Sequence, residues 1–178
     1  MGNNTWDKVV LVNEEDEQLS EMDKLEAHQL GLLHRAFSVF IFNSQGEMLI
    51  HQRAFEKYHG GGLWTNACCS HPQWGEEVLF SAEARLKYEM GLSCTLEKMF
   101  TFLYHAKVEK GLIEHEFDHV LLGYTDEEPH IHKDEVASYK WLDPKEVYLR
   151  TQTHPEEFTY WFKEALPNVL NHLEIPFQ

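Results

Sequence analysis

Two β-rich runs joined by a tight turn are the feature that most narrows the fold of this chain. Residues 36–42 and 47–52 are rich in the large apolar side chains that strands favour. The sequence Asn-Ser-Gln-Gly between them, at 43–46, is typical of a hairpin turn. Further strands are predicted at 9–12, 64–70, 100–108, 113–124 and 137–142.

Only a few helical segments interrupt these strands. Residues 76–90 carry apolar side chains at helical spacing, and Gly91 is a natural C-terminal stop. A second helix is predicted at 155–170, whereas 20–33 is predicted to be helical or irregular. This mixture predicts an α/β layered fold with a mixed sheet. No repeat, low-complexity tract or linker-like segment divides the sequence, so we expect a single domain over residues 1–178.

The charge balance restricts the partners. The chain has 30 acidic and 15 basic residues, a formal net charge of -15. Long-range repulsion therefore opposes binding to nucleic acid or to an anionic membrane. A small anionic substrate remains possible if basic side chains or metal ions gather around it.

The cysteines and the N-terminus indicate the compartment. Cys68 and Cys69 are adjacent and Cys94 is left over, which makes a poor disulfide framework and fits a reducing environment. The N-terminus has no basic region followed by an apolar stretch, and no apolar run approaches about 20 residues. We therefore expect an unanchored cytoplasmic protein.

One predicted strand carries three carboxylates on the same face. Glu114, Glu116 and Asp118 alternate with other residues, and alternate side chains of a strand point to the same side. The three carboxylates either line a solvated face or share a hard divalent cation that offsets their repulsion. The strand alone does not decide between these alternatives.

A thiol and an imidazole lie two residues apart in the segment 64–72. Cys69 and His71 come at the end of a predicted strand and just before a predicted helix. A single cysteine there would more often be a packing residue, and a single histidine is weak evidence for a ligand. Imidazoles combined with carboxylates suit Mn, Zn or Mg, depending on geometry. The candidate metal ligands are His28, His34, His71, Glu114 and Glu116, with Cys69 as a further donor.

The helix at 76–90 resembles part of the Nudix box, in which carboxylates hold magnesium against a diphosphate. Glu76 and Glu89 are retained. Ala84, Arg85 and Tyr88 stand where the box has Arg, Glu and Glu. The helix is thus predicted to bind a magnesium-bound diphosphate but to be poorly equipped for hydrolysis.

Four segments together resemble type I isopentenyl-diphosphate isomerases. They are residues 33–38, 65–72, 88–91 and 114–116, and the resemblance covers roughly residues 5–165. It implies a Nudix-like α/β/α fold and an isomerase that interconverts isopentenyl and dimethylallyl diphosphate, the building blocks of isoprenoids. The double bond would move by protonation and deprotonation through a carbocation.

The resemblance also implies a role for individual residues. His28, His34, His71, Glu114 and Glu116 would bind one divalent metal (Mn, Mg or Zn), and Glu89 would help hold Mg on the diphosphate. The implied catalytic residues are Cys69, Glu116, Tyr104 and Trp161. Positions that bind the diphosphate are matched by Lys24, Arg53, Lys57 and Arg85. Residues 1–30 would form a first strand and a segment that covers the active site, in a monomer or a weak homodimer.

Two alternative functions are disfavoured by the sequence. A Nudix-type diphosphate hydrolase is disfavoured by the degenerate carboxylate box. A non-catalytic Nudix-fold binding module is disfavoured because binding needs no thiol facing a carboxylate. Cys68 and the remaining histidines, including His51 and His59, are predicted to have no role in the site.

Overall fold

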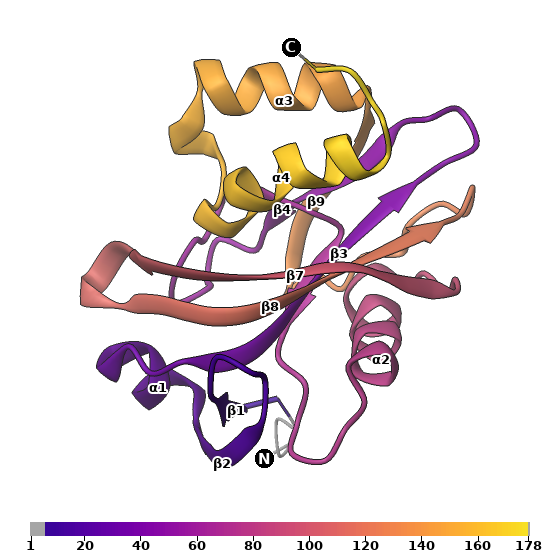
Figure 1. Cartoon of the computed structure of the whole chain (residues 1–178). Helices are drawn as coiled ribbons and strands as arrows, with labels where there is room; N and C mark the ends of the chain where they lie inside the picture. Colours follow the sequence, from indigo (N-terminus) through magenta and orange to yellow (C-terminus); the bar gives the residue numbers. More distant parts are fainter. Residues whose placement is uncertain (1–5, 178) are drawn as a thin grey trace.

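A computed structural model of the chain describes residues 6–177, and its strands form one nine-stranded mixed sheet (Figure 1). The strands are β1 (Lys8–Val12), β2 (Gln18–Asp23), β3 (His34–Phe42), β4 (Met48–Arg53), β5 (Trp64–Thr65), β6 (Cys68–Ser70), β7 (Leu96–Lys107), β8 (Ile113–Tyr124) and β9 (Val136–Leu142). The helices are α1 (Lys24–Leu30), α2 (Val78–Met90), α3 (Pro144–Thr153) and α4 (Tyr160–His172), with 3₁₀ turns at Glu109–Gly111 and Pro155–Glu157. Strands β3 and β8 are parallel, whereas β7 pairs with β8 in the antiparallel direction. The predicted α/β fold with a mixed sheet is confirmed.

The central strand β3 is buried along its whole length because helices cover both faces of the sheet. Phe40 and Phe42 belong to a core cluster that includes the apolar side of α4. Val39 and Ile41, on the other face, pack in a second cluster with the apolar side of α2. Alternate side chains of one strand thus serve two cores, which is the α/β/α layering that the resemblance implied (Figure 1).

The segment predicted as helical or irregular at 20–33 is partly a strand. Residues 18–23 form β2, which pairs with β1 at the edge of the sheet, and only Lys24–Leu30 is helical. The side chains of β2 are mostly exposed, so its sequence lacks the apolar alternation that reveals a half-buried strand. Of the predicted N-terminal segment at 1–30, residues 1–5 lie outside the described part of the chain.

The C-terminal helix prediction was wrong in two respects. Helix α3 was not predicted, although Asp143 caps it by accepting hydrogen bonds from the amides of Lys145 (2.8 Å) and Glu146 (3.3 Å). Helix α4 begins at Tyr160 rather than at 155. The delay arises because Phe158 bridges to Trp64 and the amide of Thr159 donates to the Trp64 carbonyl, so this stretch is extended.

The single strand predicted at 64–70 is instead two short strands, β5 and β6, which pair with β4 and β3. The remaining boundaries are close to the predicted ones. Helix α2 starts at Val78 instead of 76, since Glu76 lies in the preceding turn, where its carboxylate accepts hydrogen bonds from the Gln73 amide and from the hydroxyl of Ser81 in the helix. Gly91 ends α2 in the left-handed conformation, with φ 68°, as predicted. Within residues 6–177 no helix is both long and apolar enough to cross a bilayer.

Candidate active site

Strand register brings together residues that are far apart in the sequence. Glu116 on β8 is next to His34 on the parallel strand β3 and next to Tyr104 on the antiparallel strand β7. On the other side of β3, Ser38 pairs with Cys69 of β6. The sheet therefore gathers the candidate imidazole, carboxylate, phenol and thiol groups around one end of β3.

Three imidazoles and two carboxylates meet there. The N–O distances are 3.4 Å between His28 Nε2 and Glu114 Oε2, 3.5 Å between His34 Nε2 and Glu116 Oε1, and 3.0 Å between His71 Nε2 and Glu116 Oε1. All five predicted metal ligands are thus in one cluster. His28 joins it because α1, bounded by Asp23 and Gly31, turns its ring inward.

The carboxylate strand is not a solvated face. Glu114 is 1% exposed, Glu116 is 7% exposed and Asp118 is fully buried, so the alternative of a shared cation is favoured. Asp118 lies farther along β8, where it accepts a hydrogen bond of 2.7 Å from the Ser38 hydroxyl. Burial and the charge of Glu116 raise the pKa of Asp118 well above its usual range.

The unpaired donor atoms of the cluster fit a divalent cation. His28 Nε2, His34 Nε2 and Glu114 Oε1 are buried without a hydrogen-bond partner among the described residues. The Nδ1 atoms of the two histidines are meanwhile fixed by the carbonyls of Lys24 (2.6 Å) and Leu32 (2.8 Å). A backbone carbonyl on Nδ1 is a common way to orient Nε2 toward a metal.

Burial and the neighbouring charges shift the pKa values of the cluster. Burial, together with the neighbouring charge of Glu116, raises the pKa of Glu114 to about 7. Burial acts in the same direction on Glu116, but the neighbouring imidazoles of His34 and His71 lower its pKa well below the usual range. For His71 burial prevails and lowers the pKa to about 3, so this imidazole is neutral and available as a ligand.

The proposed phenol is hydrogen-bonded to Glu116, and the proposed thiol lines the same pocket as Glu116. Tyr104 donates a hydrogen bond of 2.6 Å to Glu116 Oε2, the oxygen that does not face the histidines. Burial raises the pKa of Tyr104 well above its usual range, so the phenol keeps its proton. Burial also raises the pKa of Cys69 to about 12, against a smaller opposing effect of Arg53, so Cys69 is a neutral thiol.

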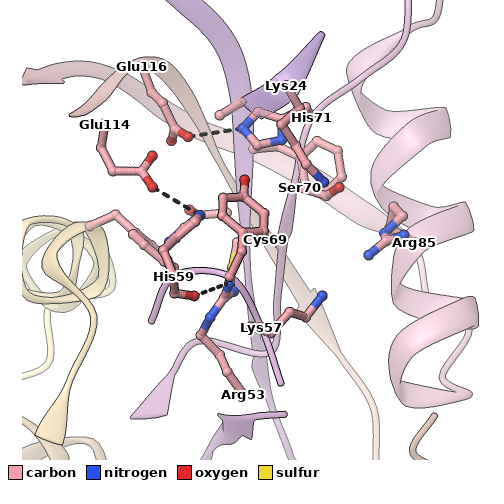
Figure 2. A pocket seen from close by; sticks show the side chains of 15 residues that line it. Lys24, Arg53, Lys57, His59, Cys69, Ser70, His71, Arg85, Glu114 and Glu116 are labelled. Carbon is pink, nitrogen blue, oxygen red and sulfur yellow. Dashed lines mark hydrogen bonds and ion pairs between the residues drawn. The ribbon is translucent and has the colours of Figure 1, made fainter. Parts of the chain in front are cut away.

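Cys69, His71, Glu114 and Glu116 line one pocket, and Figure 2 shows their side chains together. The pocket has a free volume of about 540 Å³, part of it open to solvent. Trp161 of α4 also lines it.

The four predicted diphosphate-binding cations line the same pocket; they are Lys24, Arg53, Lys57 and Arg85. Burial, followed by the charges of Lys57 and Arg85, lowers the pKa of Lys24. Nε of Arg53 and Nε of Arg85 are buried without a hydrogen-bond partner in the described part of the chain. Buried, mutually repelling cations with free donors form a natural site for an anion.

Glu89, the predicted magnesium ligand, is paired with Arg85 on α2. A further carboxylate, Glu135, was not predicted. It pairs with Lys57 and lies 3.4 Å from Arg85 Nη2, so it partly neutralises the cations. Glu135 precedes β9 and is far from the motifs in sequence, which is why no local pattern pointed to it.

His59 was predicted to have no role, but the structure places it in the pocket, 3.3 Å from Glu114 Oε1. Tyr58 beside it also lines the pocket and was missed. Both follow Lys57 in the loop before the Gly60-Gly61-Gly62 run, a position that could have drawn attention to them. His51 and Cys68 are buried and do not line this pocket.

Comparisons with known proteins agree with this arrangement. The NUDIX domain model matches residues 32–162. A relative from Pectobacterium atrosepticum named isopentenyl-diphosphate Delta-isomerase is 53% identical over 156 residues, which cover 88% of this chain and 87% of the relative. A relative from Aromatoleum aromaticum named isopentenyl-diphosphate Delta-isomerase 2 is 44% identical over 165 residues, with coverage of 93% and 87%.

Solved structures share the fold at low sequence identity. A protein of Deinococcus radiodurans superposes with a TM-score of 0.75 at 19% identity, covering 90% of this chain and 98% of that protein. A MutT protein from Methanosarcina mazei gives a TM-score of 0.66 at 14% identity, with coverage of 80% and 96%. The domain match and the high identity of the named relatives show that the chain belongs to the NUDIX family and, within it, to the isopentenyl-diphosphate Delta-isomerases.

Proposed function

We propose that this protein interconverts isopentenyl diphosphate and dimethylallyl diphosphate, with Cys69 and Glu116 as the proton-transfer pair. The observation that carries the proposal is a pocket lined by that thiol and that carboxylate and also by four cations suited to a diphosphate. The named relatives support the same substrate. The product would supply isoprenoid biosynthesis in the cytoplasm.

The reaction needs one proton added to a carbon of the alkene and another removed from a different carbon, through a tertiary carbocation. Two groups in opposite protonation states must therefore flank the five-carbon chain. Cys69 is a thiol because burial raises its pKa, whereas Glu116 is a carboxylate because His34 and His71 lower its pKa. This state allows Cys69 to donate a proton and Glu116 to accept one.

The reverse direction starts from the state that this transfer leaves behind, a thiolate and a carboxylic acid. Tyr104 donates its hydrogen bond to Glu116 Oε2 and would relay the proton when the pair is reset. The indole of Trp161 would stabilise the carbocation by about 2 kcal/mol if the pocket is desolvated. Exclusion of water would also prevent capture of the cation as an alcohol.

Three histidines and two glutamates would hold the metal in the cluster described above. The chemistry that a bound divalent metal supplies is a fixed geometry for Glu116 and a shift in its acidity. Three imidazoles favour manganese or zinc over magnesium, which prefers oxygen ligands. Glu89 would contribute a carboxylate to a magnesium ion carried by the diphosphate, and metal analysis of the purified protein would identify the ion in the cluster.

Incubation with isopentenyl diphosphate in heavy water tests the proposal. Deuterium incorporation into dimethylallyl diphosphate without phosphate release is the expected result, and NMR of the products would detect it. Release of phosphate would instead favour a Nudix hydrolase. Unchanged substrate in the presence of magnesium and manganese would favour a binding module, and either result would refute the isomerase proposal.

A further inference from the structure

His59 occupies a loop that is held firmly in place beside the metal cluster. The loop follows β4, and its Gly61 lies so close to the backbone that a Cβ there would be 2.6 Å from the Phe55 carbonyl oxygen. The tip of the β7–β8 hairpin supports the loop from outside, because Lys110 Nζ donates to the Tyr58 carbonyl at 2.8 Å and Glu109 accepts from the Gly60 amide. His59 is 7% exposed.

The two ends of His59 contact two different parts of the site. Its Nε2 is 3.3 Å from Glu114 Oε1, and Glu114 is one of the proposed metal ligands. Its backbone carbonyl accepts a hydrogen bond of 3.2 Å from Nη2 of Arg53, one of the cations proposed to bind the diphosphate, and Figure 2 shows this contact. One residue therefore links the metal cluster to the diphosphate subsite.

Glu114 is held between two imidazoles. His28 Nε2 is 3.4 Å from Oε2, while His59 Nε2 is 3.3 Å from Oε1. Each oxygen thus faces one imidazole nitrogen, and these two contacts favour one orientation of the carboxylate. A ligand fixed in this way loses less conformational entropy when the metal binds.

His28, His59 and Glu114 do not form a second, independent metal site. Their donor atoms lie within 4.8 Å of one another, but His28 Nε2 also belongs to the group with His34, His71 and Glu116. The other nitrogen of His28 is used by the Lys24 carbonyl. Since one imidazole nitrogen binds one metal ion, the arrangement fits a single ion with His59 outside its direct ligands.

We infer that His59 is a positioning residue. It orients the Glu114 side chain for the metal, and its backbone carbonyl joins the metal cluster to the Arg53 side chain. This inference rests on the proposed function for the identity of the metal cluster. In this role His59 acts through Glu114 rather than as a direct ligand of the metal. Loss of such an outer contact typically lowers metal affinity about 10- to 100-fold.

The test measures metal affinity rather than turnover. Zn²⁺ would be titrated into the metal-stripped full-length protein in competition with a chromophoric chelator, for the parent chain, His59→Ala and His59→Gln. We expect His59→Ala to bind Zn²⁺ about 10- to 100-fold more weakly. His59→Gln should recover most of the affinity, because its side-chain amide can donate to Glu114.

Two controls distinguish a positioning role from direct metal binding and from general loosening of the fold. His51→Gln removes a buried imidazole that is hydrogen-bonded to the Ala67 carbonyl and does not line the pocket, and it should bind Zn²⁺ like the parent. The visible absorption of the Co²⁺-loaded protein reports the direct ligands, and it should be the same in His59→Ala and the parent at saturating Co²⁺.

Equal Zn²⁺ affinity of His59→Ala and the parent would overturn the inference. An altered Co²⁺ spectrum in His59→Ala would also overturn it, since His59 would then be a direct ligand. Equal weakening by His51→Gln, or no recovery in His59→Gln, would point to general loosening of the fold instead. If the parent itself binds no divalent metal, the proposed metal cluster fails rather than the role of His59 alone.

Discussion

Replacing Tyr104 with Phe removes one hydroxyl from the proposed reaction centre and little else. The ring would keep its stacking against Phe102, at 5.4 Å between centroids, and against Tyr160, at 5.8 Å. The lost interaction is the 2.6 Å hydrogen bond from the phenol to Glu116 Oε2. Glu116 Oε1, which faces His34 and His71, would be unaffected.

The size of the effect follows from the type of hydrogen bond. A buried hydrogen bond to a charged group contributes about 1.5 to 3 kcal/mol. If all of it acts in the transition state, kcat falls about 10- to 150-fold, because about 1.4 kcal/mol corresponds to a factor of ten. The KM for isopentenyl diphosphate should change little, since the four cations line the pocket and Tyr104 is not among its lining residues.

The assay is conversion of isopentenyl diphosphate followed by NMR, together with metal content and thermal midpoint. Tyr160→Phe is a matched control, because it removes the hydroxyl of the exposed tyrosine whose ring stacks against Tyr104. Its kcat should equal that of the parent. A near-normal kcat in Tyr104→Phe would refute the relay, and a lower kcat accompanied by metal loss would show that Tyr104 acts through the metal cluster.

Three further changes test other parts of the site. Cys69→Ala should abolish turnover while Cys68→Ala leaves near-normal rates, because of these two cysteines only Cys69 lines the pocket. Equal losses of activity in steady-state assays would contradict the catalytic role of Cys69. Alkylation of Cys69 by iodoacetamide can be followed by mass spectrometry. Its rate should rise about tenfold per pH unit from pH 7 to 10 without a plateau, because the thiolate fraction grows with pH up to the raised pKa of about 12. A plateau near pH 8 would contradict the effect of burial on this pKa. Trp6→Ala should raise the KM for isopentenyl diphosphate about 2- to 30-fold, with a smaller effect on kcat. The Arg85 guanidinium lies 4.4 Å from the centre of the Trp6 indole, and such cation–π contacts contribute about 0.5 to 2 kcal/mol. Trp74→Ala, at an exposed position, is its control, and an unchanged KM in Trp6→Ala would show that Trp6 does not position Arg85.

The sequence predicted the parts of the fold whose local signals are strong. The hairpin at 36–52 and the helix ending at Gly91 were predicted because turn residues and apolar spacing are local properties. The edge strand β2 and the polar helix α3 were missed, since neither has a clear apolar face. The delayed start of α4 depends on a contact between Phe158 and Trp64 that no local pattern encodes.

The residues of the candidate site also divide into those that sequence motifs predicted and those that depend on contacts in the folded chain. The resemblance supplied the metal-ligand, thiol and cation residues, which the structure brings together around one end of β3. His59 and Glu135 were missed because their importance lies in contacts with Glu114, Lys57 and Arg85, which depend on the folded chain. Nor could the sequence tell that burial keeps Cys69 protonated.

The most direct measurement is a crystal structure of the metal-loaded protein with a non-reactive analogue of isopentenyl diphosphate. We expect the sulfur of Cys69 and the carboxylate of Glu116 to contact opposite sides of the five-carbon chain, with the diphosphate among Lys24, Arg53, Lys57 and Arg85. Both groups on the same side of that chain, or one of them out of contact with it, would contradict the proposed proton transfer.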